Sequence, residues 1–290
     1  MVVRSGLHTC LKINIINLCD KYIGESLHVK VCKLILGVHR KTTNHAVRGE
    51  LGSFPILLTL LRLSVKYWWH LNDLCMKNTD MLVVDALVEN RKGSTNYFTW
   101  SGGIKNTLYV LDRSDIWTKP NICTGSSIPT VVSNGLENIY SKLWYNCITN
   151  AQPKLRTYCR FKTNFILENY VRMFNLSTRV AFSKLRISAH TLMIEKGRHT
   201  YPKIPINDRL CKFCELLEIE DEYHFVMSCP LYKSQRDTLL NSLCATFDIN
   251  SLSNDDIFKM IMSANDYDTL KIVTCFVNSS FKTRSISTTI

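Results

Sequence analysis

Four potential metal ligands lie close together near the middle of the C-terminal half, and they constrain this chain more than any other feature. Cys211, Cys214, His224 and Cys229 follow the spacing Cys-x2-Cys-x9-His-x4-Cys. Zinc binds four nitrogen or sulfur ligands in a tetrahedron, and a Cys-x2-Cys turn can direct two thiolates at one ion. Because the protein supplies all four positions, the spacing predicts a structural Zn²⁺ site with no position left for a substrate. The alternative interpretation is two unrelated buried cysteines and a core histidine.

The five-residue step from His224 to Cys229 places a condition on the local fold. On an ideal α-helix, residues five apart lie about 140° apart around the axis rather than on one face. The chain must therefore leave the helix between them, and Pro230 favours that exit because it disfavours a helical conformation at Cys229. We expect Asp221 or Glu222 to orient His224 through its other ring nitrogen, as carboxylates do beside metal sites. The alternative is that both acids are only solvated.

The composition is that of an ordinary globular protein. Hydrophobic residues make up 46% of the 290 residues and charged residues 21%, which excludes a disordered or fibrous chain. Twelve cysteines are fewer than a disulfide scaffold of this length would carry. No run approaches the roughly eighteen apolar residues of a membrane span, and polar residues interrupt the N-terminal apolar positions, unlike a signal-peptide core. We therefore expect reduced cysteines, an intracellular location in the nucleus or cytoplasm, and no membrane partner.

The formal net charge of +12 is unevenly distributed along the chain. Residues 151–212 hold thirteen Lys and Arg against three acids, and residues 30–48 add five basic residues and no acid. Positive charge at this density attracts a phosphate backbone, so RNA or DNA is the expected partner. A solvated basic helix face is the alternative interpretation. The candidate nucleic-acid contacts are Lys184, Arg186, His190, Arg198 and Arg209.

Apolar residues recur at helical spacing through most of the chain, and few segments alternate as strands do. Helices are expected, among others, at 26–36 with Ser26 as cap, at 56–76, at 178–195, and at 254–263 with Ser253 or Asn254 as cap. The predicted fold is mainly α, an irregular multi-helix bundle with a small Cys3His zinc-binding subdomain. The predicted order of regions is an N-terminal helical region at 1–92, a loop-rich linker at 93–133, a basic helical region at 134–200, the zinc-binding segment at 201–246, and C-terminal helices at 247–290.

Three stretches carry a resemblance when they are taken in order. The first runs from residue 32 to 55 and contains Cys-Lys-Leu-Ile-Leu-Gly-Val and Gly-Glu-Leu-Gly. The second runs from 184 to 198, and the third joins the metal-ligand spacing to Cys-Pro-x-Tyr and Arg236. Together they resemble the C-terminal region of non-LTR retrotransposon polyproteins, downstream of the reverse transcriptase, across residues 27–240. The third stretch is similar to the zinc-binding segment that follows the polymerase in such elements.

The resemblance implies a role linked to nucleic acid, with a separate reverse transcriptase polypeptide as a further partner. A polymerase needs paired carboxylates that hold two metal ions, and in this family they lie in an aromatic-x-Asp-Asp turn. The Asp255-Asp256 pair follows Ser253-Asn254 and begins a helical pattern instead, where acids complement the helix dipole. The polymerase segments would then precede Met1.

We therefore expect a non-catalytic, zinc-binding chain that associates with RNA or DNA and has no small-molecule substrate. The alternative is a structural or protein-interaction remnant of a decayed element, without independent activity.

Overall fold

A computed structural model describes most of the chain, and the structural statements below refer to the described residues. These are residues 23–77, 81–92, 94, 99–118, 128–150 and 153–289. Within them the structure is helical, and β-pairing is limited to two isolated bridges, Leu51 with Leu167 and Leu210 with Ile219. The predicted mainly α, multi-helix fold is confirmed. Among the described helices, none combines the length and the apolarity that a membrane crossing requires.

The chain divides into two compact units that do not follow chain order. Unit 1 comprises Met1–His28 and Phe54–Leu143, and unit 2 comprises Val29–Ser53 and Trp144–Ile290. The stretch 29–53 thus packs with the half of the chain that holds the metal ligands. The five regions expected from the sequence are consecutive and do not include this exchange, which depends on contacts between segments more than ninety residues apart.

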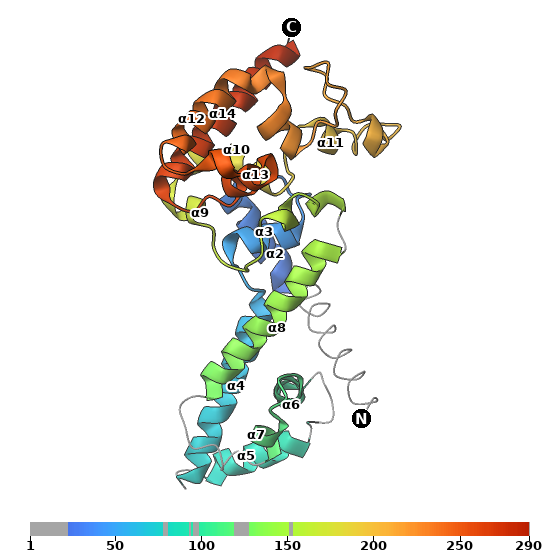
Figure 1. Ribbon diagram of the computed structural model, residues 1–290. Coiled ribbons are helices and arrows are strands. Elements are labelled where there is room, and N and C mark those ends of the chain that lie inside the picture. Colours follow the sequence, from blue (N-terminus) through green and yellow to red (C-terminus); the bar gives the residue numbers. More distant parts are fainter. Residues whose placement is uncertain are drawn as a thin grey trace, which may run out of the picture. The chain divides into compact units, whose positions relative to one another are not determined.

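Unit 1 is built on the long helix α4, which begins after Pro55 as predicted. Its helices, shown in Figure 1, are α4 (Ile56–Met76), α5 (Met81–Lys92), α6 (Trp100–Val110), α7 (Ser114–Thr118) and most of α8 (Ile128–Asn150). The indole of Trp68 stacks on that of Trp117 with ring centroids 5.3 Å apart. Val65 and Leu108 are fully buried, so the apolar faces of α4, α6 and α7 enclose one core.

Helices occupy much of the stretch for which the sequence predicts a loop-rich linker. Thr99 caps α6, because its hydroxyl accepts a hydrogen bond from the Gly102 amide at 3.1 Å. Gly102 and Gly103 lie within this helix rather than in a turn, and Ile104 is buried. Two adjacent glycines favour a turn locally, but the cap and the buried apolar face stabilise a helix here. The linker prediction, which includes one short helix at about 104–112, therefore misses the helical residues 100–103 and 114–118.

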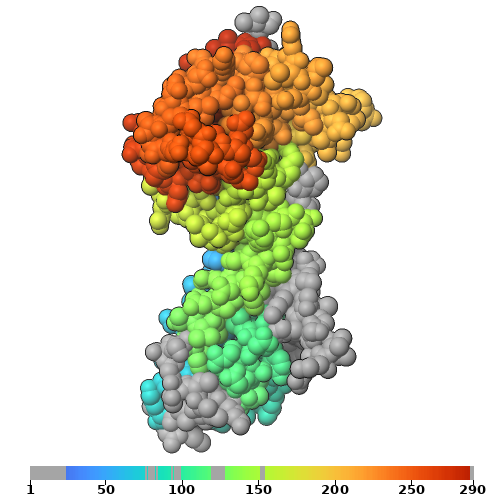
Figure 2. Space-filling model, in the orientation of Figure 1, coloured from blue at the N-terminus to red at the C-terminus, as the bar shows by residue number. Residues whose placement is uncertain are grey.

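Unit 2 contains the remaining helices. They are the C-terminal part of α2 (Ile23–Leu36), α3 (Asn44–Leu51), η3 (Pro153–Leu155), η4 (Tyr158–Arg160), α9 (Asn169–Met173), α10 (Leu176–Arg186), α11 (Met193–Lys196), η5 (Ile206–Asp208), η6 (His224–Ser228), η7 (Pro230–Tyr232), α12 (Lys233–Cys244), η8 (Ile249–Ser251), α13 (Asn254–Met262) and α14 (Tyr267–Thr289). The long helix α14 packs against α10 and α12 (Figure 1). In the space-filling view, C-terminal residues coloured orange to red form most of the visible face of this unit (Figure 2). Their apolar side chains share one core with the metal-binding segment.

Two helix boundaries differ from the sequence-based expectation. Helix α2 already includes Ile23, so Ser26 lies inside it and is not its cap. The helix predicted at 178–195 is broken into α10 and α11, because Ser188 adopts a left-handed conformation with φ 52°. The Ser188 hydroxyl donates to the buried carboxylate of Glu222 at 2.6 Å. This distant hydrogen bond stabilises the break, which no local pattern indicates.

The start of α13 agrees with the sequence. The Asp256 amide donates to the Ser253 hydroxyl at 3.2 Å, so Ser253 is the N-cap. Asp255 lies in the first turn of the helix and pairs with Lys259 at 2.7 Å. The Asp-Asp pair therefore begins a helix, as predicted.

Candidate metal centre

The four predicted ligands converge. One ligand atom from each of Cys211, Cys214, His224 and Cys229 lies within 4.8 Å of all the others. The sulfurs of Cys211 and Cys229 are 3.9 Å apart, and the sulfur of Cys214 is 3.5 Å from Nε2 of His224. In a tetrahedral zinc site with Zn–S of about 2.3 Å and Zn–N of about 2.0 Å, two sulfurs lie about 3.8 Å apart and sulfur and nitrogen about 3.5 Å apart. The arrangement therefore fits a metal ion held by three sulfurs and one nitrogen.

A short hairpin presents the first two ligands. The Cys211 amide donates to the Glu218 carbonyl at 2.9 Å, and the Glu220 amide donates to the Arg209 carbonyl at 2.9 Å. These bonds flank the bridge between Leu210 and Ile219. Cys211 and Cys214 lie in the loop of this hairpin, so its backbone pairing orients both sulfurs toward the same point.

A π-helical turn brings the last two ligands together. Residues His224–Ser228 form this turn, and the Cys229 amide donates to the His224 carbonyl at 2.8 Å. In a π-turn the hydrogen bond joins residues five apart, so these two residues lie on one face. The chain becomes extended at Cys229, with ψ 123° before Pro230. The chain therefore leaves the helix at Cys229, as predicted. Ideal α-helical geometry does not predict the π-turn that precedes this exit and brings the two ligands onto one face.

Glu218 orients the ligand histidine. One of its carboxylate oxygens lies 2.8 Å from Nδ1 of His224, which leaves Nε2 facing the sulfurs. The prediction that Asp221 or Glu222 would do this is wrong. Asp221 accepts the backbone amide of His224 at 2.8 Å instead, and Glu222 faces away toward Ser188 and its neighbours. Glu218 reaches the ring because the hairpin folds back over the π-turn, and sequence spacing does not indicate this.

Burial and the hydrogen bonds among these side chains shift their pKa values. Contact with Cys229 and burial raise the pKa of Cys211 to about 12. The hydrogen bond from Cys211 lowers the pKa of Cys229. Burial alone would lower the pKa of His224, but its hydrogen bonds with Cys211 and Glu218 outweigh burial and raise that pKa to about 9. A metal ion binds thiolates and neutral imidazole, so it must displace these protons.

Arg236 places a positive charge beside the sulfurs. Three thiolates around a divalent ion leave a net charge of about −1, which costs free energy when it is buried. Arg236 is 8% exposed and donates to the Cys229 carbonyl at 2.7 Å. Its guanidinium approaches from α12, so the helix that follows the metal segment also compensates its charge.

The structure does not gather the five candidate nucleic-acid contacts on one surface. Arg186 is only 1% exposed, and its guanidinium donates to Glu50 at 2.8 and 3.0 Å. It also lies 3.0 Å from Glu168 and bonds the Met262 carbonyl. The ring of Phe161 lies under it, 4.8 Å away. These contacts make Arg186 a core residue whose donors are already used by the protein.

His190 and Arg209 are also held inside unit 2. Nε2 of His190 lies 2.9 Å from Glu222, and the side chain is buried. Arg209 donates to the carbonyls of Ile194 and Ile204 at 2.8 and 2.9 Å. Both residues therefore connect the segment after α10 to the metal-binding segment.

Arg198 and Lys184 are more accessible. Arg198 is partly exposed and lies 3.2 Å from Glu195. Lys184 is half-buried on α10, and no ion pair or side-chain hydrogen bond joins it to a described residue. Of the five candidates, Lys184 alone is both unpaired within the described chain and open to solvent.

The basic block has two roles in the structure. Seven of its thirteen cations are held by carboxylates or backbone carbonyls of unit 2: Arg156, Arg160, Lys162, Arg179, Arg186, Arg198 and Arg209. The other six form no ion pair or side-chain hydrogen bond with a described residue: Lys154, Arg172, Lys184, Lys196, Lys203 and Lys212. Local sequence does not separate the two groups, because the paired cations meet acids from distant segments.

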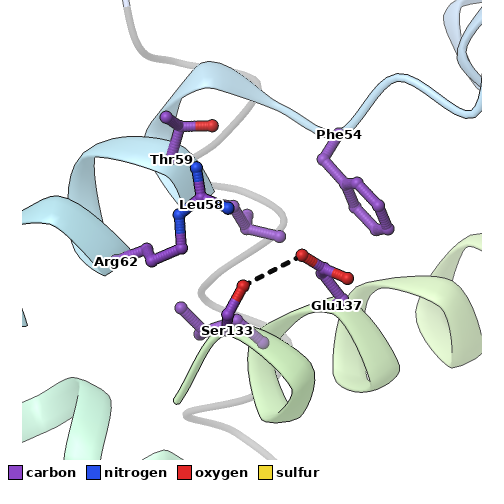
Figure 3. A pocket seen from close by; sticks show the side chains of 7 residues that line it. Phe54, Leu58, Thr59, Arg62, Ser133 and Glu137 are labelled. Carbon is purple, nitrogen blue, oxygen red and sulfur yellow. Dashed lines mark hydrogen bonds between the residues drawn. The ribbon is translucent and has the colours of Figure 1, made fainter. Parts of the chain in front are cut away.

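A small pocket lies in unit 1 between the start of α4 and α8 (Figure 3). The Ser133 hydroxyl donates to Glu137 at 3.0 Å, and Phe54, Leu58 and Arg62 also line the space. Its volume is about 60 Å³, far below the roughly 300 Å³ of the smallest typical ligand pockets. It is therefore too small to seat a substrate.

We compared the chain with known proteins after establishing this geometry. No protein-family model matches it, and neither a curated protein nor a solved structure matches it with significance. The metal centre and the charges around it are therefore the features that bear on function.

Proposed function

We propose that this chain is a non-catalytic module in which a structural zinc ion organises a helical, basic surface that binds the backbone of RNA or DNA. The observation that carries the proposal is the Cys3His cluster, whose sulfur–sulfur and sulfur–nitrogen distances of 3.9 and 3.5 Å suit a tetrahedral zinc site. All four positions come from the protein, so the ion has a structural role. The resemblance to the C-terminal region of non-LTR retrotransposon reverse transcriptases supports this role, and we include that relationship in the proposal.

Surface charge supports the nucleic-acid part of the proposal. The chain carries +12 overall, and six cations of the basic block are unpaired within the described residues. Each phosphate contact to a single strand contributes about 0.7 to the slope of log affinity against log salt. Six contacts would therefore give a slope of at most about 4.

Metal analysis of the purified protein tests the zinc site. We expect one equivalent of zinc in the wild type and its loss in Cys214→Ser. Cys244→Ser is the matched control, because Cys244 is an exposed free cysteine outside the cluster. A wild-type protein that binds no metal after zinc is supplied would contradict the proposal.

Binding to fluorescently labelled single-stranded RNA and DNA tests the second part. We expect affinity for both that falls steeply with salt, since backbone contacts release counterions. A second candidate function is a structural or protein-interaction part of a larger assembly. The internal pairing of seven of the thirteen cations favours it. Stoichiometric zinc without oligonucleotide binding at any salt concentration would support that candidate instead.

A further inference from the structure

Unit 2 contains a large cavity that is open to solvent, with a volume of about 820 Å³. This volume lies within the range of ligand pockets, roughly 300–1,000 Å³. Four parts of the chain form its wall: the loop between α2 and α3, the turn η3, the segment from Ser188 to His199, and the C-terminal part of α14. All of them belong to the same compact unit.

The wall of this cavity is strongly basic. Lys41, Lys154 and Lys196 line it from three different elements, and none of them forms an ion pair with a described carboxylate. The one acid in the wall is Glu195, which is 3% exposed. Arg198 lies 3.2 Å from its carboxylate and Arg156 3.5 Å, so its charge is compensated and covered. The cavity therefore presents positive charge to whatever enters it.

Most side chains of the wall end in a charged or hydrogen-bonding group, although carbon atoms contribute more of its exposed area than polar atoms do. Besides the lysines it contains Thr42, Ser188, Thr191 and Ser285, and the one aliphatic residue in it is Ala189. No Phe, Tyr or Trp lines it, and its aromatic rings are those of His39, His190 and His199. The unpaired lysines and the hydroxyl groups of this wall suit phosphate groups.

The metal-binding segment supports this wall from behind. Glu220 lies between the ligands Cys214 and His224, and it holds Arg284 with two hydrogen bonds of 2.8 and 2.9 Å. Glu222 holds His190 at 2.9 Å in the same way. Arg284 and His190 both line the cavity. The segment that the metal organises therefore positions two residues of the wall.

We propose that this cavity is a phosphate-binding site that seats the sugar-phosphate backbone of a single nucleic-acid strand, with Lys41, Lys154 and Lys196 as its contacts. The proposal rests on the proposed function and specifies where the strand binds. Of the residues predicted from the sequence as contacts, it includes His190 as part of the wall and none of the arginines. Lys41, Lys154 and Lys196 are all new assignments, and the first two lie 113 residues apart in the chain.

The test compares two triple variants of the full, zinc-loaded chain. In the cavity variant Lys41, Lys154 and Lys196 are each changed to Ala. In the control variant Lys233, Lys271 and Lys282 are changed to Ala. These control lysines are exposed on α12 and α14 of the same unit, outside this cavity. Circular dichroism and zinc content confirm folding of each variant. Affinity for a labelled single-stranded oligonucleotide is then measured across a range of salt concentrations.

We expect the slope of log affinity against log salt to be shallower by about 2 in the cavity variant than in the wild type, because each lost phosphate contact removes roughly 0.7. The control variant keeps the wild-type slope. An oligonucleotide of abasic sites should bind the wild type nearly as well as one with bases. Bound oligonucleotide should also protect the three cavity lysines from acetylation. This second readout does not depend on the variants.

Each failure has a different meaning. A wild type that binds no oligonucleotide contradicts the proposed function itself. Oligonucleotide binding that is equal in the cavity variant and the wild type, or that requires bases, overturns the cavity assignment alone. Cavity lysines that bound oligonucleotide leaves unprotected from acetylation also overturn the cavity assignment.

Discussion

The carboxylate of Glu218 controls the orientation of the histidine ligand in the metal site. It accepts a hydrogen bond from Nδ1 of His224 and is itself half-exposed. A partner of this kind fixes the tautomer and orientation of a ligand histidine. Glu218 is not itself a metal ligand, so its removal takes away an orienting group and leaves all four ligands in place.

We predict that Glu218→Ala lowers zinc affinity by about 10- to 100-fold. The physical reason is that the imidazole then rotates freely and loses the negative charge beside it. Competition with a chromophoric chelator measures the change. Glu215→Ala is the matched control, because Glu215 is an exposed acid of the same loop. Equal affinities of the two variants would contradict the assigned role of Glu218.

Arg186 and Glu50 illustrate a buried ion pair at the residue scale. Burial opposes ionisation of Glu50, but the charge and hydrogen bonds of Arg186 outweigh it and hold the pKa of Glu50 below its ordinary value. This pair therefore stabilises the fold above the ordinary pKa of glutamate, and the contribution is lost as pH falls through the lowered pKa.

We predict that Arg186→Met lowers the free energy of unfolding by about 3–5 kcal/mol at pH 7, because it removes the guanidinium that pairs with the buried carboxylate of Glu50. Burial then raises the pKa of Glu50, so the loss should shrink as pH falls from 7 toward about 4.3. Urea denaturation at pH 7 and pH 5 with excess zinc measures it. The double variant Glu50→Gln/Arg186→Met should lose less at pH 7. A loss independent of pH would contradict this account.

At the scale of helices, two glycines occupy opposite environments. A Cβ at Gly49 on α3 would lie 2.5 Å from the indole of Trp144 and 2.6 Å from the hydroxyl of Tyr158. A Cβ at Gly103 on α6 would have no heavy atom within 4 Å. The first glycine allows α3 to pack closely against buried aromatic residues, whereas the second has no such packing role.

We predict opposite effects of the two alanine substitutions. Gly49→Ala should destabilise unit 2 by about 1–3 kcal/mol, because rigid, buried rings must move. Gly103→Ala should stabilise unit 1 by about 0.5–1 kcal/mol through the better helix propensity of alanine. Thermal and urea unfolding of both variants measure this. A stabilised Gly49→Ala protein would show that α3 does not pack as described.

At the scale of the whole molecule, the metal segment connects distant parts of unit 2. Glu220 pairs with Arg284 of α14, Glu222 bonds Ser188 and His190, and Arg236 of α12 contacts the carbonyl of the last ligand. None of these contacts involves unit 1. Binding energy of the metal ion should therefore be folding energy for unit 2.

We predict that removing the metal with a chelator increases amide hydrogen exchange in α12, α14 and the segment 188–229. Exchange in α4 and α6 should change little, because these helices belong to the other unit. Mass-spectrometric hydrogen exchange with and without chelator measures both, and re-addition of zinc should restore protection. Uniform loss of protection in both units would contradict this division.

Features with a local cause follow from the sequence. The ligand set of Cys211, Cys214, His224 and Cys229 converges because its spacing already suits a metal ion. Pro55 precedes α4, and Gly37, with φ 65°, follows the end of α2. Ser253 caps α13 through an amide three residues away. In each case the deciding interaction joins residues no more than 18 apart in the chain.

Only the tertiary structure decides which charges are structural and which face solvent. Arg186 donates a hydrogen bond to Glu50, which lies 136 residues away in the chain. Glu222 accepts one from Thr157, which lies 65 residues away. These partners convert a uniform basic block into internal ion pairs and a separate cavity wall that includes Lys154. The sequence by itself determined the metal ligands and most helices, because those depend on neighbours along the chain. The surface that meets a partner depends on which acids fold back to pair with which cations, and this is decided by packing between distant segments.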